Sequence, residues 1–350
     1  MRVLLADPAA FTPQYDHALA TALAEAGAEV TLVTSPFRFG DVPDAQKYRR
    51  QELFYPLSSH LFRRSALRLP LKAMEHPVGL TRLARCASDV VHVQWLAAPQ
   101  LDDRLLRLRA PAVFTAHDLL PRRTASRRRL WRRLLARFPW IVVHSERGRD
   151  LLVDFGVSEA RLRVIPHPVF HSDPPRADDG GTLLSLGVIR PYKGLGDAIE
   201  VAKRLGTRLL VAGDPMEPVA RYRDAAGPVA EWRLGYLSEA ELDRALGEST
   251  VALFPYRAEL DQSGALLRAL GAGVPAIVYD VGGLADPVRA YDAGRVVASG
   301  DVEALTAAAS ELLGDSGALA AARAGAERAR RELTWEASAA AHLELYRTLA

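Results

Sequence analysis

The feature that most constrains the fold is an alternation of short apolar segments with helical segments along the 350-residue chain. This pattern predicts buried strands at Val3–Leu5 and Val30–Val33. Between them Tyr15–Ala26 repeats apolar residues at helical spacing until Gly27 ends the helix. A strand, a helix and a strand within about thirty residues make a βαβ unit, and its repetition predicts a parallel sheet. Further strands of this sheet are expected at Val90–Val93, Ala112–Thr115 and Ile141–His144.

The alternation stops once and then restarts. Phe170–Gly181 has no period and is rich in Pro, Asp and Gly, so we interpret it as a linker between domains. The sequence therefore predicts an α/β protein of two doubly wound Rossmann-like domains, residues 1–170 and 181–334, facing each other across a cleft at their strands' carboxyl ends. In the second domain we expect strands Leu183–Gly187, Arg208–Ala212, Val251–Pro255 and Ala276–Tyr279, and helices Leu195–Leu205, Glu239–Leu246 and Gly264–Leu270, before a mostly helical tail.

Composition limits the protein class and the compartment. No apolar run approaches the roughly 20 residues of a membrane span, and the first residues favour a buried strand over a signal peptide. The single cysteine, Cys86, excludes an intramolecular disulfide and a cysteine-based zinc cluster, which favours a cytoplasmic protein. Residues 1–170 hold 26 Lys and Arg against 16 Asp and Glu, whereas the remainder holds 19 against 26. Two halves of opposite charge suggest two domains with different partners, although arginines on solvated helices explain the same numbers.

A first chemical motif is Ser185–Gly196, SLGVIRPYKGLG. It places Arg190 and Lys193 on a loop between a strand and a helix, where their charge adds to the helix dipole. Such a loop can stabilise the negative charge that develops on a departing diphosphate without a metal ion. A surface turn with incidental basic residues is the alternative.

A second motif is Tyr256–Pro275, YRAELDQSGALLRALGAGVP, followed by Asp280–Leu284 at the end of the next strand. Ser263 and Gly264 begin a helix, and Gly264 lets the backbone N–H groups approach a phosphate closely. The alternative is structural, because turns between helices and strands favour glycine in any case.

Together these motifs resemble family 4 of the retaining glycosyltransferases. The matching segments are LGVIRPYKG, LVAGDP, GYLSEAEL, ALFPYR, QSGALLRALGAGVPAIVYDVGGL and TWEASAAAHLELYR, in order over residues 183–348. The first half matches more thinly, through GAEVTLVT, DVVHVQW, TAHDLLPR, VHSERGRDLL and RVIPHPV. The resemblance implies a GT-B fold, with the donor in the second domain, the acceptor mainly in the first, and a final helix (335–350) that packs back on the first. It also implies retention of the anomeric configuration, a front-face ion-pair mechanism and no metal.

The resemblance assigns roles residue by residue. Lys193 matches the family's diphosphate-binding lysine. In many members an arginine directly follows the first glycine, where this chain has Val188, and we assign its work to Arg190 two places later. His117 matches the histidine that meets the donor sugar, with Asp118 expected to orient it, while a capped histidine after a strand is the alternative.

One departure from the family concerns its pair of glutamates. The alignment places Leu260 and Arg268 at the two positions, and arginine has no acceptor atom for a ribose diol. Glu259 or Asp261 can replace the first carboxylate by a one-residue shift, so both are candidates. The other donor-binding candidates are Tyr236, Gln262, Ser263, Gly264, Ala265, Gly282 and Gly283.

The first half offers weaker candidates. Gln14, Tyr15 and Asp16 begin the first helix and are expected near the acceptor, although Asp16 can equally cap that helix. Arg122–Arg137 carries eight arginines in sixteen positions, interleaved with Leu and Trp. It predicts a basic amphipathic helix that either contacts an anionic membrane at its inner face or meets a phosphorylated acceptor. A solvated helix packed by its apolar face explains it equally well, and no motif supports nucleic-acid binding.

The predicted function is transfer of a hexose from a nucleotide-diphosphate sugar, UDP- or GDP-linked, to a glycan, glycolipid or small-molecule acceptor, with no further cofactor and no metal. Two alternatives stay open: a catalytically silent relative that binds sugar nucleotides, favoured by Leu260 and Arg268, and a sugar-nucleotide epimerase. The missing glutamate pair counts against the epimerase.

Overall fold

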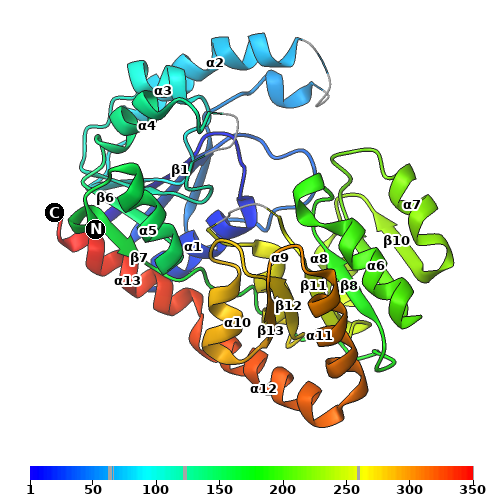
Figure 1. Cartoon of the computed structure of the whole chain (residues 1–350). Coiled ribbons are helices and arrows are strands. Elements are labelled where there is room, and N and C mark those ends of the chain that lie inside the picture. Colours follow the sequence, from blue (N-terminus) through cyan, green and yellow to red (C-terminus); the bar gives the residue numbers. More distant parts are fainter. Residues whose placement is uncertain (62–64, 66, 121–123, 258–260, 350) are drawn as a thin grey trace. The chain divides into compact units, whose positions relative to one another are not determined.

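The computed structural model describes residues 1–61, 65, 67–120, 124–257 and 261–349 and divides the chain into two compact units. Unit 1 comprises Met1–Pro166 and Trp335–Ala350, and unit 2 comprises His167–Thr334. Each unit holds one parallel α/β sheet, as the sequence predicted (Figure 1). Within the described residues, no helix combines the length and the apolar composition needed to cross a membrane.

The sheet of unit 1 has the order β3-β2-β1-β4-β5-β6-β7. The order reverses its direction between β1 and β4, which makes these two neighbours the topological switch point. Its strands are β1 Arg2–Asp7, β2 Glu29–Thr34, β3 Arg49–Glu52, β4 Val90–Val93, β5 Ala112–Thr115, β6 Trp140–Val143 and β7 Leu162–Val164. Its helices are α1 Pro13–Glu25, α2 Arg68–Leu83, α3 Pro99–Leu105, α4 Arg128–Leu135, α5 Glu146–Phe155 and α13 Trp335–Arg347, with 3₁₀ turns at Ser58–His60 and Glu159–Arg161.

The last helix completes unit 1. In Figure 1 α13 (red) lies beside α1, and its Tyr346 hydroxyl lies 2.6 Å from Nδ1 of His92 on β4. Trp335, at its first turn, packs edge-on against Tyr15 of α1. The C-terminal segment therefore belongs to the same compact unit as the N-terminus, although 168 residues of the other unit, 167–334, separate them along the chain.

The sheet of unit 2 has the order β10-β9-β8-β11-β12-β13, with its switch point between β8 and β11. Its strands are β8 Leu183–Leu186, β9 Leu209–Gly213, β10 Ala230–Leu234, β11 Val251–Phe254, β12 Ala276–Tyr279 and β13 Gly294–Val297. Its helices are α6 Leu195–Leu205, α7 Ala220–Ala226, α8 Glu239–Gly247, α9 Gly264–Gly271, α10 Ala285–Tyr291, α11 Val302–Gly314 and α12 Ser316–Glu332, with 3₁₀ turns at Pro191–Lys193 and Gly227–Val229.

The segment interpreted as a linker is packed along unit 2. The amide of Ser172 donates to the carbonyl of Gly271, and the amide of Ala177 donates to the carbonyl of Gly247. Neither glycine has room for a side chain, because an added Cβ would lie 2.1 Å from the carbonyl oxygen of Phe170 at Gly271 and 2.4 Å from that of Pro175 at Gly247. The division between the units therefore falls at Pro166, before this segment.

Candidate functional site

In unit 2 a cation lies at the switch point of the sheet. Lys193 follows β8, and its ammonium donates to the hydroxyl of Tyr256, which follows β11, at 2.7 Å. That hydroxyl lies 3.1 Å from Oγ of Ser263, the N-cap residue of α9. Ligands of doubly wound sheets bind where strand order reverses, at the carboxyl ends of the strands. Lys193, Tyr256 and the start of α9 occupy that place.

The surroundings of Lys193 suit an anion. A Cβ added to Gly187 would lie 3.3 Å from Nζ of Lys193 and 3.1 Å from Cβ of Ala265, so the glycine brings the ammonium close to the first turn of α9. Gly264, which opens this helix, is exposed. Burial raises the pKa of the Tyr256 phenol, which keeps it neutral beside the ammonium. The positive charge and the N-terminal end of the helix dipole therefore act on the same space.

A hydrogen-bonded network holds the loop that carries Lys193. Asp197, in the first turn of α6, accepts three hydrogen bonds from the guanidinium of Arg257, at 2.7, 2.8 and 3.1 Å, and one from the Tyr279 hydroxyl at 2.9 Å. The amide of Arg257 donates to the carbonyl of Tyr192. These contacts join the ends of β8, β11 and β12, so the position of Lys193 is set by three strands at once.

Arg190 differs from Lys193 in its surroundings. Its side chain is exposed, and among the described residues it forms no hydrogen bond or ion pair. Val188 lies two residues before it on the same loop and is half-buried. The structure thus leaves Arg190 available to a ligand, while Val188 offers only its backbone and an apolar surface.

The loop before α9 is tied to the loop after β12. The amide nitrogen of Gln262 donates to the carbonyl of Gly283 at 3.1 Å, and its oxygen accepts from the amide of Ser263. Gly282 has a positive φ of 53°, which favours glycine at this turn. Asp261 is completely buried, and the other carboxylate candidate, Glu259, lies outside the described residues together with Leu260.

Arg268, which stands where the family has a glutamate, forms an ion pair with the carboxylate of another residue. Its guanidinium forms a two-point ion pair with Glu239 at 2.6 and 2.9 Å and stacks on the ring of Phe170. Glu239 begins α8, three residues after Tyr236, whose side chain is 41% exposed. Each carboxylate oxygen keeps a second lone pair, so Glu239 can still accept hydrogen bonds from a ligand. Glu239 thus places a hydrogen-bond acceptor beside position 268, where the family has a glutamate and this chain has an arginine.

In unit 1 polar side chains gather at the ends of the three neighbouring strands β4, β5 and β6. His117 follows β5, and its Nε2 lies 2.9 Å from Oε1 of Gln94, which follows β4. Its Nδ1 lies 3.3 Å from Nε2 of His144, which follows β6. Trp95 stacks on one face of the His117 ring, and Tyr15 approaches it edge-on. These contacts hold the imidazole in a single orientation.

The prediction that Asp118 orients His117 is wrong, because the groups facing both ring nitrogens are Gln94 and His144. Burial lowers the pKa of His144 to about 4, so this ring is neutral at pH 7. Its Nδ1–H donates to the carbonyl of Ile165, which leaves Nε2 to accept from Nδ1–H of His117. The Gln94 amide can then serve either state of Nε2 on His117: its oxygen accepts from a protonated nitrogen, and after a rotation its NH₂ donates to a lone pair.

Two buried carboxyl groups, Asp7 and Asp16, lie in the same unit at the end of β1 and in α1. Asp7, at the end of β1, accepts from the amides of Ala9 and Thr12, and its side chain hydrogen-bonds to that of Asp16. The helix begins after Thr12, so the alternative that Asp16 caps it is wrong. Asp16 is 1% exposed and Tyr15 is 2% exposed, which places both inside the unit and not on an open acceptor surface. Gln14 is more accessible and donates to the carbonyl of Asp41.

Asp16 should make stability depend on pH. Burial, followed by the charge of Asp7, raises the pKa of Asp16 well above its ordinary value, so the folded protein keeps a proton that the unfolded chain releases near pH 4. The contribution of this proton to the free energy of unfolding is complete below pH 4 and is lost as pH rises through the pKa of Asp16 in the folded protein. The free energy of unfolding falls there by up to about 1.4 kcal/mol per pH unit. Asp16→Asn keeps a hydrogen-bond donor toward Asp7, so its free energy of unfolding should fall less steeply with pH. Urea unfolding between pH 5 and 8 measures this slope. The exposed Asp44→Asn is the control, and equal slopes for the two variants would contradict a buried proton.

The arginine-rich stretch forms a helix that is packed into unit 1. Arg122 and Arg123 lie outside the described residues, and α4 spans Arg128–Leu135. Its apolar residues Leu130, Trp131, Leu134 and Leu135 are buried in the core of the unit. The apolar face is therefore occupied, and a membrane contact through α4 would depend on charge alone.

Several residues of both sites were missed by the sequence reasoning. Gln94 and His144 directly follow a buried strand, Trp95 comes one residue after Gln94, and Asp7 is the last residue of β1. Their signal was their position at the carboxyl ends of parallel strands. Tyr256 lay within a motif that was recognised, but it was not singled out.

Two Rossmann-like units, each with one parallel sheet, match the GT-B class of fold. Solved structures of this fold match the whole chain. A sucrose-phosphate synthase from Thermosynechococcus elongatus has a TM-score of 0.76 at 21% identity, covering 100% of this chain and 99% of the other. Anabaena HepE in complex with UDP-glucose has a TM-score of 0.75 at 12% identity, covering 100% of both chains.

The sequence model of Glycosyltransferase Family 4 matches residues 14–172, and that of Glycosyl transferases group 1 matches residues 180–315. The chain belongs to the family 4 type of glycosyltransferases. A glycogen synthase of Mycobacterium tuberculosis is 30% identical over 207 residues, 55% of this chain and 50% of the relative. An exopolysaccharide phosphotransferase of Streptomyces coelicolor is 34% identical over 207 residues, 53% of this chain and 21% of the relative. The chain thus spans half or less of the curated relatives it matches.

Proposed function

We propose that the protein transfers a hexose from a nucleotide-diphosphate sugar, UDP- or GDP-linked, to a carbohydrate, lipid-linked or small-molecule acceptor. The observation that carries this proposal is the ammonium of Lys193 at the switch point of unit 2, hydrogen-bonded to Tyr256 beside the start of α9. A diphosphate matches this place because it carries negative charge and several acceptor oxygens. HepE, whose fold is shared, was solved with UDP-glucose, and this supports the choice of donor.

The reaction we propose retains the anomeric configuration and needs no metal. The bond from the anomeric carbon to the diphosphate oxygen breaks, and its electron pair stays on that oxygen. The acceptor hydroxyl forms the new bond to carbon, and its proton goes to the departing diphosphate. Lys193, Arg190 and the amides of α9 stabilise the charge that develops on this group. His117, held by Gln94 and His144, is proposed to contact the donor sugar.

For the nucleoside we propose contacts with the start of α8. Tyr236 offers an exposed ring for the base, and Glu239, paired with Arg268, offers oxygens for the ribose hydroxyls. Gly282, Gly283 and Gln262 form the tied loops beside α9 and are proposed to line the sugar. We also propose a cytoplasmic location, because the single cysteine suits a reducing compartment.

A panel of UDP- and GDP-sugars tests this function in two ways. At about 100 times its Kd a donor adds about 2.7 kcal/mol of stability, which should raise Tm by several degrees. We expect at least one donor to raise Tm and to be hydrolysed faster than in buffer, with no change in rate when EDTA is added. Binding without hydrolysis would favour the silent relative, and an epimerised sugar would favour the epimerase. A rate lost with EDTA and restored by a divalent metal would contradict metal independence.

A further inference from the structure

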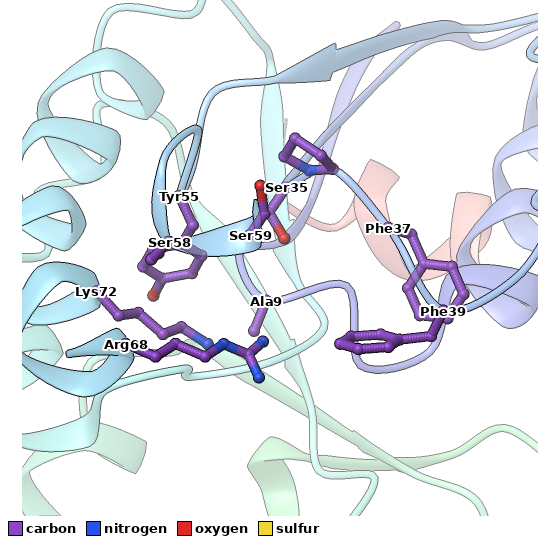
Figure 2. Close-up of a pocket in the computed structure, with 10 residues that line it drawn as sticks. Ala9, Ser35, Phe37, Phe39, Tyr55, Ser58, Ser59, Arg68 and Lys72 are labelled. Carbon is purple, nitrogen blue, oxygen red and sulfur yellow. The ribbon is translucent and has the colours of Figure 1, made fainter. Parts of the chain in front are cut away.

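A pocket in unit 1 lies at the same sheet edge as His117, on the other side of β1. Its walls come from the loops after β1 and β2, the segment after β3, and α2 (Figure 2). Figure 2 shows the side chains of Arg68 and Lys72 running next to each other from α2 into this space. Ser35, Ser58 and Ser59 also line the pocket, and the Ser58 hydroxyl donates to Glu75. The pocket thus combines two cations with small hydrogen-bonding groups.

Lys72 has no carboxylate partner among the described residues. Its ammonium lies 4.3 Å from the centre of the Tyr55 ring and 5.6 Å from that of Phe11. Glu75, one turn further along α2, is committed elsewhere: it accepts from the amides of Leu57 and Ser58 at 2.7 and 3.1 Å. Burial and the neighbouring charge of Arg68 lower the pKa of Lys72 to about 8. The charge of Asp7 acts in the opposite direction on this pKa, but none of the described carboxylates forms an ion pair with Lys72, which lies beside a second cation.

The wall beside Lys72 is rigid. The Tyr55 hydroxyl lies 2.6 Å from Nδ1 of His76, whose Nε2 lies 2.7 Å from Asp102, and all three side chains are buried. The hydroxyl is therefore occupied by His76, and the Lys72 ammonium lies over the face of the ring. Tyr55 also has a positive φ of 51°, a strained conformation for a side chain of this size. Strain of this kind persists where the surrounding contacts hold it, and it is common at ligand sites.

A continuous series of ring contacts joins the pocket to His117. Lys72 lies over Phe11, Phe11 packs edge-on against Trp95 with ring centres 5.2 Å apart, and Trp95 stacks on His117 at 5.1 Å. Phe11 is 53% exposed although it lies between two contacts of the site. A small molecule bound at Lys72 would extend over Phe11 toward His117.

We propose that this pocket binds a phosphate or carboxylate group of the acceptor, with Lys72 and Arg68 supplying the positive charge. The inference rests on the proposed function only where it calls the ligand an acceptor. The anion site itself does not depend on that function. A neutral sugar would leave the Lys72 ammonium without an ion pair in the described part of the chain. An anionic sugar would pair with this ammonium and place its remaining hydroxyls on the side of His117.

The test is the acetylation rate of Lys72 in the full chain at pH 8, followed by peptide mass spectrometry. At constant ionic strength, inorganic phosphate, glucuronate, glucose and phosphatidylglycerol vesicles are the probes, and Lys47, an exposed lysine paired with Glu25, is the internal control. We expect phosphate, glucuronate or the vesicles to slow the acetylation of Lys72 at least about fivefold relative to that of Lys47. Glucose should have no effect on this rate. Arg68→Met should lose most of the protection. The probe that protects identifies a free phosphate, a carboxylate or a lipid headgroup as the source.

Equal protection by glucose, or protection by none of the anions, would overturn the proposal. The failure of the proposed function is separate, because it would be seen as the absence of any thermal shift with sugar nucleotides. If anions protect Lys72 and no nucleotide binds, the anion site stands and the donor assignment fails.

Discussion

Lys193→Ala should lower kcat by about 10² to 10³ and leave the fold intact. The loss is that of one preorganised donor to a developing oxyanion. The fold should survive because the Tyr256 hydroxyl, which Lys193 contacts, keeps its second partner Ser263 at 3.1 Å. Steady-state hydrolysis of the best donor gives kcat, and thermal unfolding without ligand should give the Tm of the unmodified protein within about 2 °C.

The matched control is Lys203→Ala. Lys203 is an exposed lysine on α6 in the same unit, so its loss removes the same charge at a distance from the switch point. Its activity should be unchanged. If Lys193→Ala also retained full activity, the assignment of the diphosphate to this loop would be wrong. If it unfolded at a much lower temperature, the role of Lys193 would be structural.

The sequence pattern predicted the centre of each sheet and missed its edges. The nine predicted strands correspond to β1, β2, β4, β5 and β6 in unit 1 and to β8, β9, β11 and β12 in unit 2. The four strands that were missed, β3, β7, β10 and β13, stand at the ends of the two strand orders. Central strands are buried on both faces and form apolar runs, whereas an edge strand such as β3, with the sequence RRQE, is largely polar. Apolar patterning alone carries no signal for such strands.

The two candidate sites differ in how they are encoded. In unit 2, Arg190, Lys193, Ser263 and Gly264 lie in two short segments, so local motifs predict that they act together. In unit 1, Gln94, His117 and His144 come from three strands and meet only because those strands are neighbours in the sheet. The choice of Asp118 as the partner of His117 followed sequence adjacency. Side chains at the ends of adjacent parallel strands provide the partners here.

The sequence also did not predict which charged residues form ion pairs. Position 268 departed from the family by carrying an arginine, and nothing local indicates that Glu239, 29 residues earlier, supplies a carboxylate to it. In the same way, the proposed anion pocket depends on the Glu75 carboxylate accepting from the amide of Ser58 and forming no ion pair with Lys72. Such pairings depend on which helices lie side by side.

Gly194→Ala should damage both stability and activity. Gly194 joins the Lys193 turn to α6 with a φ of +68°, and an added Cβ would lie 2.0 Å from the carbonyl oxygen of Pro255. This oxygen belongs to the backbone, so the loop after β8 or the end of β11 must move. The strained dihedral alone costs about 1–3 kcal/mol, and the collision adds to it. We expect urea unfolding to show a loss of at least about 2 kcal/mol. We also expect kcat to fall by about 10²-fold, since a displacement of about 1 Å in positioning groups has effects of that order.

Gly196→Ala, two residues further, separates this effect from glycine replacement in general. Gly196 lies in the first turn of α6, and an added Cβ would meet no atom within 4 Å. Alanine is the better helix former by about 1 kcal/mol, so this variant should be at least as stable as the unmodified protein. Wild-type stability and turnover in Gly194→Ala would show that the close approach of the two strand ends is not needed. A large loss in Gly194→Ala with none in Gly196→Ala would tie activity to the spacing that brings Lys193 against Tyr256 and the start of α9.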